Sequence, residues 1–325
     1  MAKLLTKKVF GKTGLLVSHL CFGTLSIGPY HSNLSVDEGA ELLAFAYKQG
    51  INFWDTAELY ETYPHINRAL KLLNYPDDII IASRSFARTY EEMKTSIDNC
   101  LNALELKTIA IFGLHEMSNQ EDFEHSQGAF EALKEAKTEK KIQNIKISMH
   151  SIEAVNIASG NSWVDCIFPL YNIAGTGIPD GTAEEMTAAI KKASQKGKAV
   201  YAMKVLAGGH LSSKAEECIN YVIKNTYVNS IAIGMDNTNE ILLNIALFTG
   251  DTKTINRIKP CVASQKKTIQ VDPWCEGCGE CIKICPNNAI TLEFSQAKIN
   301  HDKCILCGYC ASACKYFCLK VVNKR

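Results

Sequence analysis

Short apolar runs alternate with longer amphipathic segments from about residue 20 to about residue 250 of the chain. The apolar runs have the length and the β-branched content of buried strands, whereas the longer segments have the period of helices that bury one face. We therefore expect eight strands, at Leu20–Gly23, Ile51–Asp55, Ile79–Ala82, Thr108–Leu114, Ile142–Ser148, Val164–Pro169, Ala199–Lys204 and Ser230–Gly234.

Helices are expected between these strands, and several begin at a recognisable cap. Ser35 and Thr89 are each followed three residues later by glutamate, the pattern of a capping box, and the first of these helices should end at Gly50. Ser151 is expected to cap a short helix. The other expected helices are Ile66–Leu73, Gly128–Lys140, Thr182–Lys196 and Asn239–Phe248.

This alternation favours a (β/α)8 barrel, in which eight parallel strands are joined by right-handed crossovers. A doubly wound sheet has the same alternation and remains an alternative. No Gly-x-Gly-x-x-Gly follows the first expected strand, which disfavours a dinucleotide-binding sheet. We expect a TIM barrel over residues 1–250. Residues 251–269 are polar without a clear period and are interpreted as a linker to a small α+β domain at 270–325.

A repeated cysteine pattern occupies the last part of the chain. Each repeat has the spacing C-x2-C-x2-C-x3-C, in which the first three thiolates bind one iron–sulfur cluster and the fourth binds the other. The expected ligands of one [4Fe–4S] cluster are Cys275, Cys278, Cys281 and Cys314. Those of the second cluster are Cys304, Cys307, Cys310 and Cys285.

Two other interpretations of these cysteines are disfavoured. A zinc ribbon needs paired C-x2-C knuckles and no third cysteine in each run. A disulfide framework suits a small secreted chain, and this chain has 325 residues. The region from about residue 270 resembles a bacterial two-cluster ferredoxin module, although Lys315 stands where the first run has Pro286. The other six of the 14 cysteines are expected to be reduced core residues.

Composition adds few constraints. The formal net charge of +1 indicates neither nucleic acid nor a membrane surface as a partner. The first residues lack the long apolar core of a signal peptide, and no apolar run could span a bilayer. We therefore expect a cytoplasmic protein. Exposed clusters of this type are oxygen-sensitive, so an anaerobic host is expected.

Polar residues follow several of the expected strands. In a barrel the chemistry lies at the carboxyl ends of the strands. Asp55, Tyr60, Arg84 and His115 stand after the second, third and fourth strands and should converge at one mouth. A phenol beside a cation or an imidazole is a plausible proton donor.

Several motifs resemble the aldo-keto reductase family. They are Phe10–Ser18, Gly50–Ala57 with Tyr60, Gly113-Leu-His115, and Gly128–Lys137 followed by Lys141-Ile-Gln. The resemblance implies a barrel that reduces carbonyls with a nicotinamide hydride. It also implies a catalytic tetrad of Asp, Tyr, Lys and His, with tyrosine as the proton donor. Asp55, Tyr60 and His115 match three of these positions, and Arg84 stands in place of the lysine, an exchange that is not conservative.

The resemblance also implies cofactor contacts after the later strands, and most of these positions depart from the family pattern. The candidate cofactor-binding residues are Ser148, His150, Met203, Lys204, Gly234 and Asn244. Asp236 would repel the 2′-phosphate of NADPH. We therefore expect NAD(P)H binding to be weak, altered towards NADH or absent. Electrons would then arrive through the two clusters, with or without a flavin. The chain also resembles a branch of the family that has C-terminal ferredoxin domains, in Met203-Lys204 and Gly208-Gly209.

Two functional hypotheses follow. The first is an oxidoreductase that reduces a carbonyl or an activated double bond of a small molecule, with Tyr60 as proton donor. The second is a non-catalytic electron-transfer protein whose barrel is a docking platform. In either case an external electron donor or acceptor of the ferredoxin or flavodoxin type is an expected partner.

Overall fold

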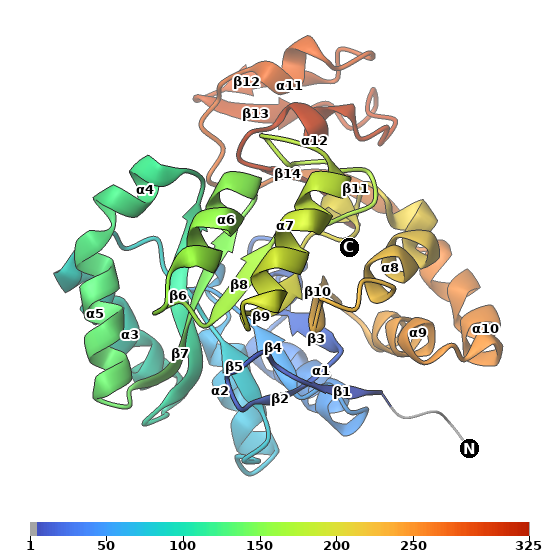
Figure 1. The fold of residues 1–325 in the computed structure, drawn as a ribbon. Coiled ribbons are helices and arrows are strands. Elements are labelled where there is room, and N and C mark those ends of the chain that lie inside the picture. Colours follow the sequence, from blue (N-terminus) through green and yellow to red (C-terminus); the bar gives the residue numbers. More distant parts are fainter. Residues whose placement is uncertain (1–4, 325) are drawn as a thin grey trace.

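Residues 5–324 are described in the computed structural model, and a closed barrel of eight parallel strands forms most of the fold (Figure 1). The strands follow one another around the barrel in the order β10-β3-β4-β5-β6-β7-β8-β9. The predicted barrel is thereby confirmed, and the doubly wound alternative is wrong. The barrel strands are β3 (Leu20–Gly23), β4 (Phe53–Asp55), β5 (Ile80–Ala82), β6 (Ile109–Met117), β7 (Ile142–Met149), β8 (Cys166–Pro169), β9 (Ala199–Ala202) and β10 (Ser230–Gly234).

Helices surround the barrel and bury their apolar faces against it. Ser35, Thr89 and Thr182 each cap a helix in a complete capping box, so the local signals in the sequence were sufficient to locate these starts. The helices of this layer are α1 (Val36–Lys48), α2 (Tyr63–Leu72), α3 (Tyr90–Leu104), α4 (Gln120–His125), α5 (Gln127–Thr138), α6 (Ile152–Gly160), α7 (Ala183–Gln195), α8 (Ala215–Ile223) and α9 (Thr238–Thr249).

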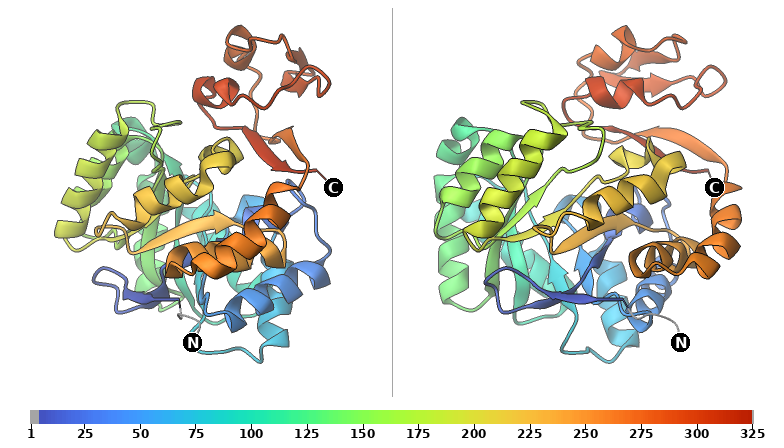
Figure 2. Two further views of the ribbon diagram at one scale, coloured as in Figure 1. Left: turned by 90° about the vertical axis from the view of Figure 1, so that its right-hand side faces the viewer. Right: turned by 45° about the vertical axis from the view of Figure 1, so that its right-hand side comes forward.

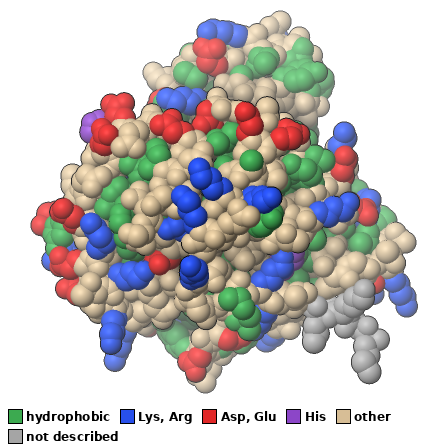
Figure 3. Space-filling model, viewed as in Figure 1, with side chains coloured by type: hydrophobic (Ala, Val, Ile, Leu, Met, Phe, Trp, Pro, Cys, Tyr) green, Lys and Arg blue, Asp and Glu red, His purple; other side chains and the backbone are tan. Residues whose placement is uncertain are grey.

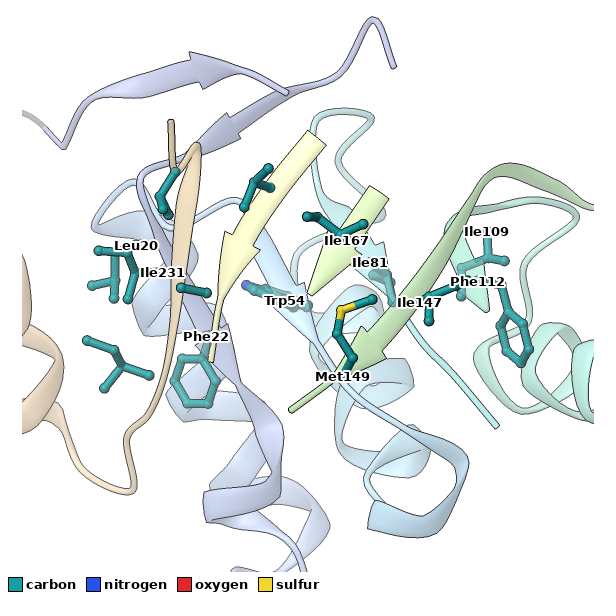
Figure 4. Close-up of a cluster of buried hydrophobic side chains, with 14 of the residues drawn as sticks. Leu20, Phe22, Trp54, Ile81, Ile109, Phe112, Ile147, Met149, Ile167 and Ile231 are labelled. Atoms are coloured by element: carbon teal, nitrogen blue, oxygen red, sulfur yellow. The ribbon is translucent and has the colours of Figure 1, made fainter. Parts of the chain in front are cut away.

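Alternate residues of each strand belong to two different apolar layers, as the pleat of a strand requires. Trp54, Ile81 and Ile167 belong to the layer between strands and helices, part of which is shown in Figure 4. Phe53 and Tyr201 belong to the layer inside the barrel. A polar side chain at a strand position that belongs to the inner layer therefore points into the barrel.

A β-hairpin precedes the barrel and covers the amino-terminal end of its strands (Figure 4). Its strands β1 (Lys7–Val9) and β2 (Leu16–Ser18) pair antiparallel. Phe10 in its turn is fully buried and packs edge-on against Phe53 and Tyr201 inside the barrel. Because this end is filled, the opposite, carboxyl end is left for the functional site.

The segment 251–269, which was expected to be a linker, contains a helix and most of a strand. Helix α10 (Thr252–Ala263) begins at Asp251, whose side chain accepts a hydrogen bond from the Thr254 amide, and Ile255 and Ile258 are buried. Strand β11 (Lys267–Val271) follows and pairs with the last strand of the chain. The apolar residues of this helix are few and are separated by lysine, arginine and other polar residues, so its sequence alone indicates no clear helical period.

The C-terminal module consists of two small sheets and two short helices. Its elements are β11, α11 (Glu280–Lys283), β12 (Ile290–Glu293), β13 (Gln296–Ile299), α12 (Tyr309–Ala313) and β14 (Leu319–Asn323). Strand β11 pairs antiparallel with β14, and β12 with β13. Figure 2 shows the module over the end of the barrel opposite the amino-terminal hairpin. It therefore stands over the carboxyl ends of the barrel strands.

Phe317 joins the two parts of the molecule. Its side chain is 1% exposed and belongs to the inner layer of the barrel, with Leu170 and Met203. Gly177 and Gly208 make room for it, because an added Cβ at either position would lie within 2.8 Å of its ring. The module is thus anchored by an aromatic side chain that enters the barrel mouth.

We expect replacement of Phe317 by alanine to loosen the module from the barrel. Truncating a buried phenylalanine costs about 3–5 kcal/mol. Limited proteolysis of residues 251–271 under anaerobic conditions would measure the effect as faster cleavage. Phe294→Ala is the matched control, because Phe294 lies in the same module and is fully exposed. Equal cleavage rates in the two variants would contradict the anchoring role of Phe317.

Charges of both signs are interspersed over the barrel face that Figure 3 shows, consistent with the small net charge. Within residues 5–324, no helix has the length and apolar character needed to cross a membrane.

Candidate active site

A chain of hydrogen bonds joins three of the predicted catalytic side chains at the barrel mouth. Arg84 Nη1 donates to Asp55 Oδ2 at 2.7 Å and to the Thr56 carbonyl at 2.9 Å. Its Nη2 donates to the Tyr60 hydroxyl at 2.5 Å. Arg84 is 2% exposed. The planar guanidinium therefore fixes the carboxylate and the phenol relative to each other, which a lysine could not do in the same way.

Lys146 and Tyr201 also belong to this group, and sequence analysis did not find them. Lys146 Nζ lies 2.8 Å from Asp55 Oδ1 and 2.8 Å from the Tyr201 hydroxyl. Tyr201 in turn donates to the same carboxylate oxygen at 2.8 Å. A signal was present, because Lys146 is a lysine between two isoleucines of an expected barrel strand, and it is fully buried.

Asp55 is therefore a buried carboxylate between two buried cations. Burial acts to raise its pKa, but Arg84 and Lys146 outweigh burial and hold the pKa below its usual range. Burial lowers the pKa of Lys146 to about 8, although Asp55 opposes this shift. The free-energy cost of burying these three charges is offset by the two ion pairs that Asp55 makes with Arg84 and Lys146.

Burial dominates the acidity of Tyr60. It raises the pKa of the phenol to about 12, even though Arg84 acts in the opposite direction. The charge of Arg84 limits the rise of this pKa and does not reverse it. Tyr60 therefore holds its proton throughout the physiological range.

His115 lies beside Tyr60 without bonding to it. The two rings meet edge-on with centroids 5.9 Å apart, and Phe86 stacks on the other side of the imidazole at 4.2 Å. Burial, and then the charge of Arg84, keep the pKa of His115 well below its ordinary value. His115 Nδ1 is buried and has no hydrogen-bond partner among the described residues. The imidazole is therefore neutral and packs against the phenol.

A cavity of about 290 Å³ opens beside this group and lies between the barrel mouth and strand β14. Asp55, Tyr60 and Arg84 line it, as do the predicted cofactor-binding residues Met203, Lys204, Gly234 and Asn244.

Ser148 and His150 are not among the described residues that line the cavity. Ser148 is buried within strand β7, where its hydroxyl accepts a hydrogen bond from the Glu116 amide at 3.3 Å. His150 Nδ1 lies 2.8 Å from Glu116 Oε1. Of the six predicted cofactor-binding residues, four therefore face the cavity.

The C-terminal module supplies one wall of the cavity, which could not be predicted from the barrel sequence alone. Lys320 lines it and lies 2.5 Å from Asp272, whose other oxygen is 3.5 Å from His31. Further along, Asn323 donates to Glu240 Oε1 at 2.8 Å and to Asp236 Oδ1 at 3.1 Å.

This acidic pair brings two carboxyl groups to the part of the cavity beside Asn323, where Lys267 offsets part of their charge. Burial and the neighbouring Asp236 raise the pKa of Glu240. A dianionic phosphate would be repelled at this end.

The eight cysteines of the repeat line two separate cavities of the C-terminal module. One is lined by Cys275, Cys278, Cys281 and Cys314, and the other by Cys285, Cys304, Cys307 and Cys310. These are the two ligand sets expected from the sequence.

The backbone around these cysteines also suits bound clusters. The amides of Ala289 and Cys318 donate to the sulfurs of Cys285 and Cys314 at 3.3 and 3.2 Å. Within residues 5–324, no three His, Cys, Asp or Glu side chains are arranged to hold a single metal ion. The donor set and the amide bonds to sulfur fit thiolate-bound iron–sulfur clusters.

The fold and the mouth define a (β/α)8 oxidoreductase class with an attached ferredoxin-type module. Residues 19–217 match the model of the aldo/keto reductase family, and residues 274–318 match that of the 4Fe-4S dicluster domain. The chain belongs to the aldo/keto reductase family.

Similar proteins agree with this family assignment. L-galactose dehydrogenase of Arabidopsis thaliana is 22% identical over 282 residues, which span 74% of this chain and 88% of that protein. The solved structure of PA4992 from Pseudomonas aeruginosa is 24% identical with a TM-score of 0.65, covering 77% of this chain and 98% of that chain. The holo form of the aldo-keto reductase AKR11C1 from Bacillus halodurans is 20% identical with a TM-score of 0.63, covering 78% and 96%. At these identities the two structures support the fold alone.

Proposed function

We propose that this protein reduces a carbonyl or an activated double bond of a small molecule in the 290 Å³ cavity, with Tyr60 as the proton donor. One observation carries the proposal. The Tyr60 oxygen accepts the hydrogen bond from Arg84 Nη2 and makes no other within the described part of the chain. The phenol proton is therefore free to be donated into the cavity.

The reaction takes up two electrons and two protons for each carbonyl converted to an alcohol, with one hydrogen added to oxygen and one to carbon. The hydrogen on carbon would come from water where the clusters supply the electrons, and would arrive as a hydride where NADH supplies them. Tyr60 would donate the proton that reaches the carbonyl oxygen. Arg84 would hold the phenol in place and stabilise the negative charge that develops as the proton leaves. Asp55 would keep Arg84 oriented, and the pair Lys146 and Tyr201 would keep Asp55 oriented.

Two [4Fe–4S] clusters bound by the cysteine sets described above would supply single electrons. Removal of one cysteine ligand should therefore affect one of the two clusters. Cys278→Ala and Cys307→Ala should each lower the iron and acid-labile sulfide content by about half relative to the intact protein. Cys261→Ala is the matched control, because Cys261 lies on α10, outside both cysteine-lined cavities, and should leave the content unchanged. Full iron content in both ligand variants would contradict the assignment.

A nicotinamide dinucleotide would be the second source of electrons. Met203, Gly234 and Asn244 line the cavity, and Asp236 and Glu240 in the same lining would repel the additional 2′-phosphate of NADPH. NADH is therefore favoured over NADPH. Anaerobic calorimetric titration with each dinucleotide measures this directly, and tighter binding of NADPH would contradict the role of the acidic pair.

The second candidate function is electron transfer without catalysis, with the barrel as a docking platform. It is favoured by Ile305 and Tyr309, which are 65% and 57% exposed beside Cys304 and Cys310. A ferredoxin or flavodoxin could dock on such a surface. The same surface would serve the enzyme as the entry point for electrons. Replacement of Tyr60, discussed below, separates the two functions.

A further inference from the structure

We propose that the substrate carries a carboxylate, which binds to the ammonium group of Lys204 while its carbonyl faces Tyr60. The inference rests on the proposed reductase function and names its substrate class. Lys204 and Tyr60 line the same cavity, so one small molecule can contact both.

Among the described residues, Lys204 is a cation of the mouth that has no ionic partner, and Lys267, which also lines the cavity, acts by its charge on Glu240. Arg84 and Lys146 are paired with Asp55, and Lys320 is paired with Asp272. No ion pair or hydrogen bond of Lys204 Nζ occurs within residues 5–324. Its ammonium instead lies 4.3 Å from the ring centroid of Phe317. A partly buried cation on an aromatic face, open to a cavity, is a binding group for an anion.

The carboxylates near Lys204 are already engaged. Glu116 lies 2.8 Å from His150, and Asp272 is shared by Lys320 and His31. Neither forms an ion pair with Lys204. An incoming carboxylate would therefore not compete with a protein carboxylate for the ammonium.

The backbone at Lys204 is held in an unusual conformation. Its φ of +55° lies in the left-handed region, which a lysine rarely adopts. The position lies two residues beyond the end of strand β9, at the carboxyl end of the barrel. Backbone strain at such a place is typical of functional sites, where the surrounding structure holds a side chain in a required direction.

The surroundings favour a monoanion over a phosphate dianion. Lys204 offers one positive charge, whereas Asp236 and Glu240 line the same cavity and Lys267 acts by its charge on Glu240. The substrate class is therefore an oxo acid, or an unsaturated acid, with a single carboxylate.

The charged surroundings of Lys204 also predict how pH affects binding. Burial, and then repulsion by Lys320, lower its pKa to about 7, while Glu116, Asp272 and Cys318 act in the opposite direction. The charge of Lys204 itself lowers the pKa of His115 and His150. Above pH 7 the free amine dominates, so binding a carboxylate requires uptake of a proton, and affinity should fall as the pH rises.

Anaerobic calorimetry of the cluster-containing protein tests the proposal with two probes of matched shape, phenylglyoxylate and its neutral methyl ester. At pH 7 the acid should bind about tenfold more tightly than the ester, because a hydrogen bond to a charged group is strong. Lys204→Met should remove this preference, and Lys204→Arg should retain it. At pH 8, titrations in two buffers of different ionisation enthalpy should show uptake of about one proton, absent in Lys204→Met.

Several outcomes would overturn the proposal. They are equal binding of acid and ester, binding of neither, or a preference for the acid that persists in Lys204→Met. Trapping of phenylglyoxylate on Lys204 by borohydride would show that the amine is a neutral nucleophile and not an anion-binding group. Tyr60→Phe separates this proposal from the proposed function, because it should abolish reduction while the preference for the acid remains.

Discussion

Replacement of Tyr60 by phenylalanine should lower kcat by a factor of about 10²–10⁴, the usual contribution of a positioned general acid. The ring, which packs edge-on against His115, would remain, and only the hydroxyl bonded to Arg84 Nη2 would be lost. Substrate affinity should change little. The measurement is steady-state reduction under anaerobic conditions, with the visible absorbance of the clusters as a check that they are intact.

Tyr171→Phe is the matched control for this variant. Its hydroxyl also forms a hydrogen bond, to Thr187 at 2.7 Å, but Tyr171 does not line the cavity. It should retain full activity. If Tyr60→Phe also retained it, the proton donor would have to be another group. If neither the intact protein nor the variant reduced a substrate, while both passed electrons to a carrier, the electron-transfer function would be favoured.

Replacement of Asp55 by asparagine should destabilise the barrel by about 3–5 kcal/mol, because two buried cations would lose their shared partner. Arg84 and Lys146 lie 2.7 and 2.8 Å from its two oxygens, and both are almost fully buried. Urea denaturation followed by circular dichroism would measure the loss as a lower midpoint. Asp98→Asn is the control, because its pair with Lys141 is about one-third to two-fifths exposed and should contribute about 0–1 kcal/mol.

The effect of Asp55 should also depend on pH in a defined direction. Its pKa is lower in the folded protein than in the unfolded chain. The stabilisation is therefore present above the unfolded pKa of about 4 and is lost as the pH falls through the folded value. The difference between the intact protein and Asp55→Asn should shrink in acid. A difference that stayed constant down to the acid limit of folding would contradict the pairing.

Signals that act over a few residues could be predicted from the sequence. The capping boxes at Ser35 and Thr89 and the eight barrel strands are of this kind, because each depends on local hydrogen bonding or on local apolar period. The helix Thr252–Ala263 was missed because its apolar face is short and only its packing makes it helical. Local sequence patterns were thus sufficient to predict the strands and helices of the barrel, but not the helix that connects the barrel to the C-terminal module.

Only the part of the candidate site that local sequence motifs mark could be predicted. Asp55, Tyr60 and Arg84 occupy positions marked by family motifs, and the structure brings them together. Lys320 and Phe317 come from the other module, and nothing in the sequence around them indicates that they reach the barrel mouth. Their place results from packing between parts of the chain that are more than 100 residues apart, as in the hydrogen bond from His210 to the Leu319 carbonyl.

The most direct test of the central claim is a single-turnover experiment on the anaerobically reduced protein. The clusters are reduced, excess reductant is removed, and the protein is mixed with phenylglyoxylate while cluster absorbance and product are followed. We predict that the clusters are reoxidised, that one mandelate forms for every two electrons released, and that Tyr60→Phe forms none. Clusters that stay reduced in the presence of carbonyl compounds, but are reoxidised at once by a ferredoxin, would contradict the account and favour an electron carrier.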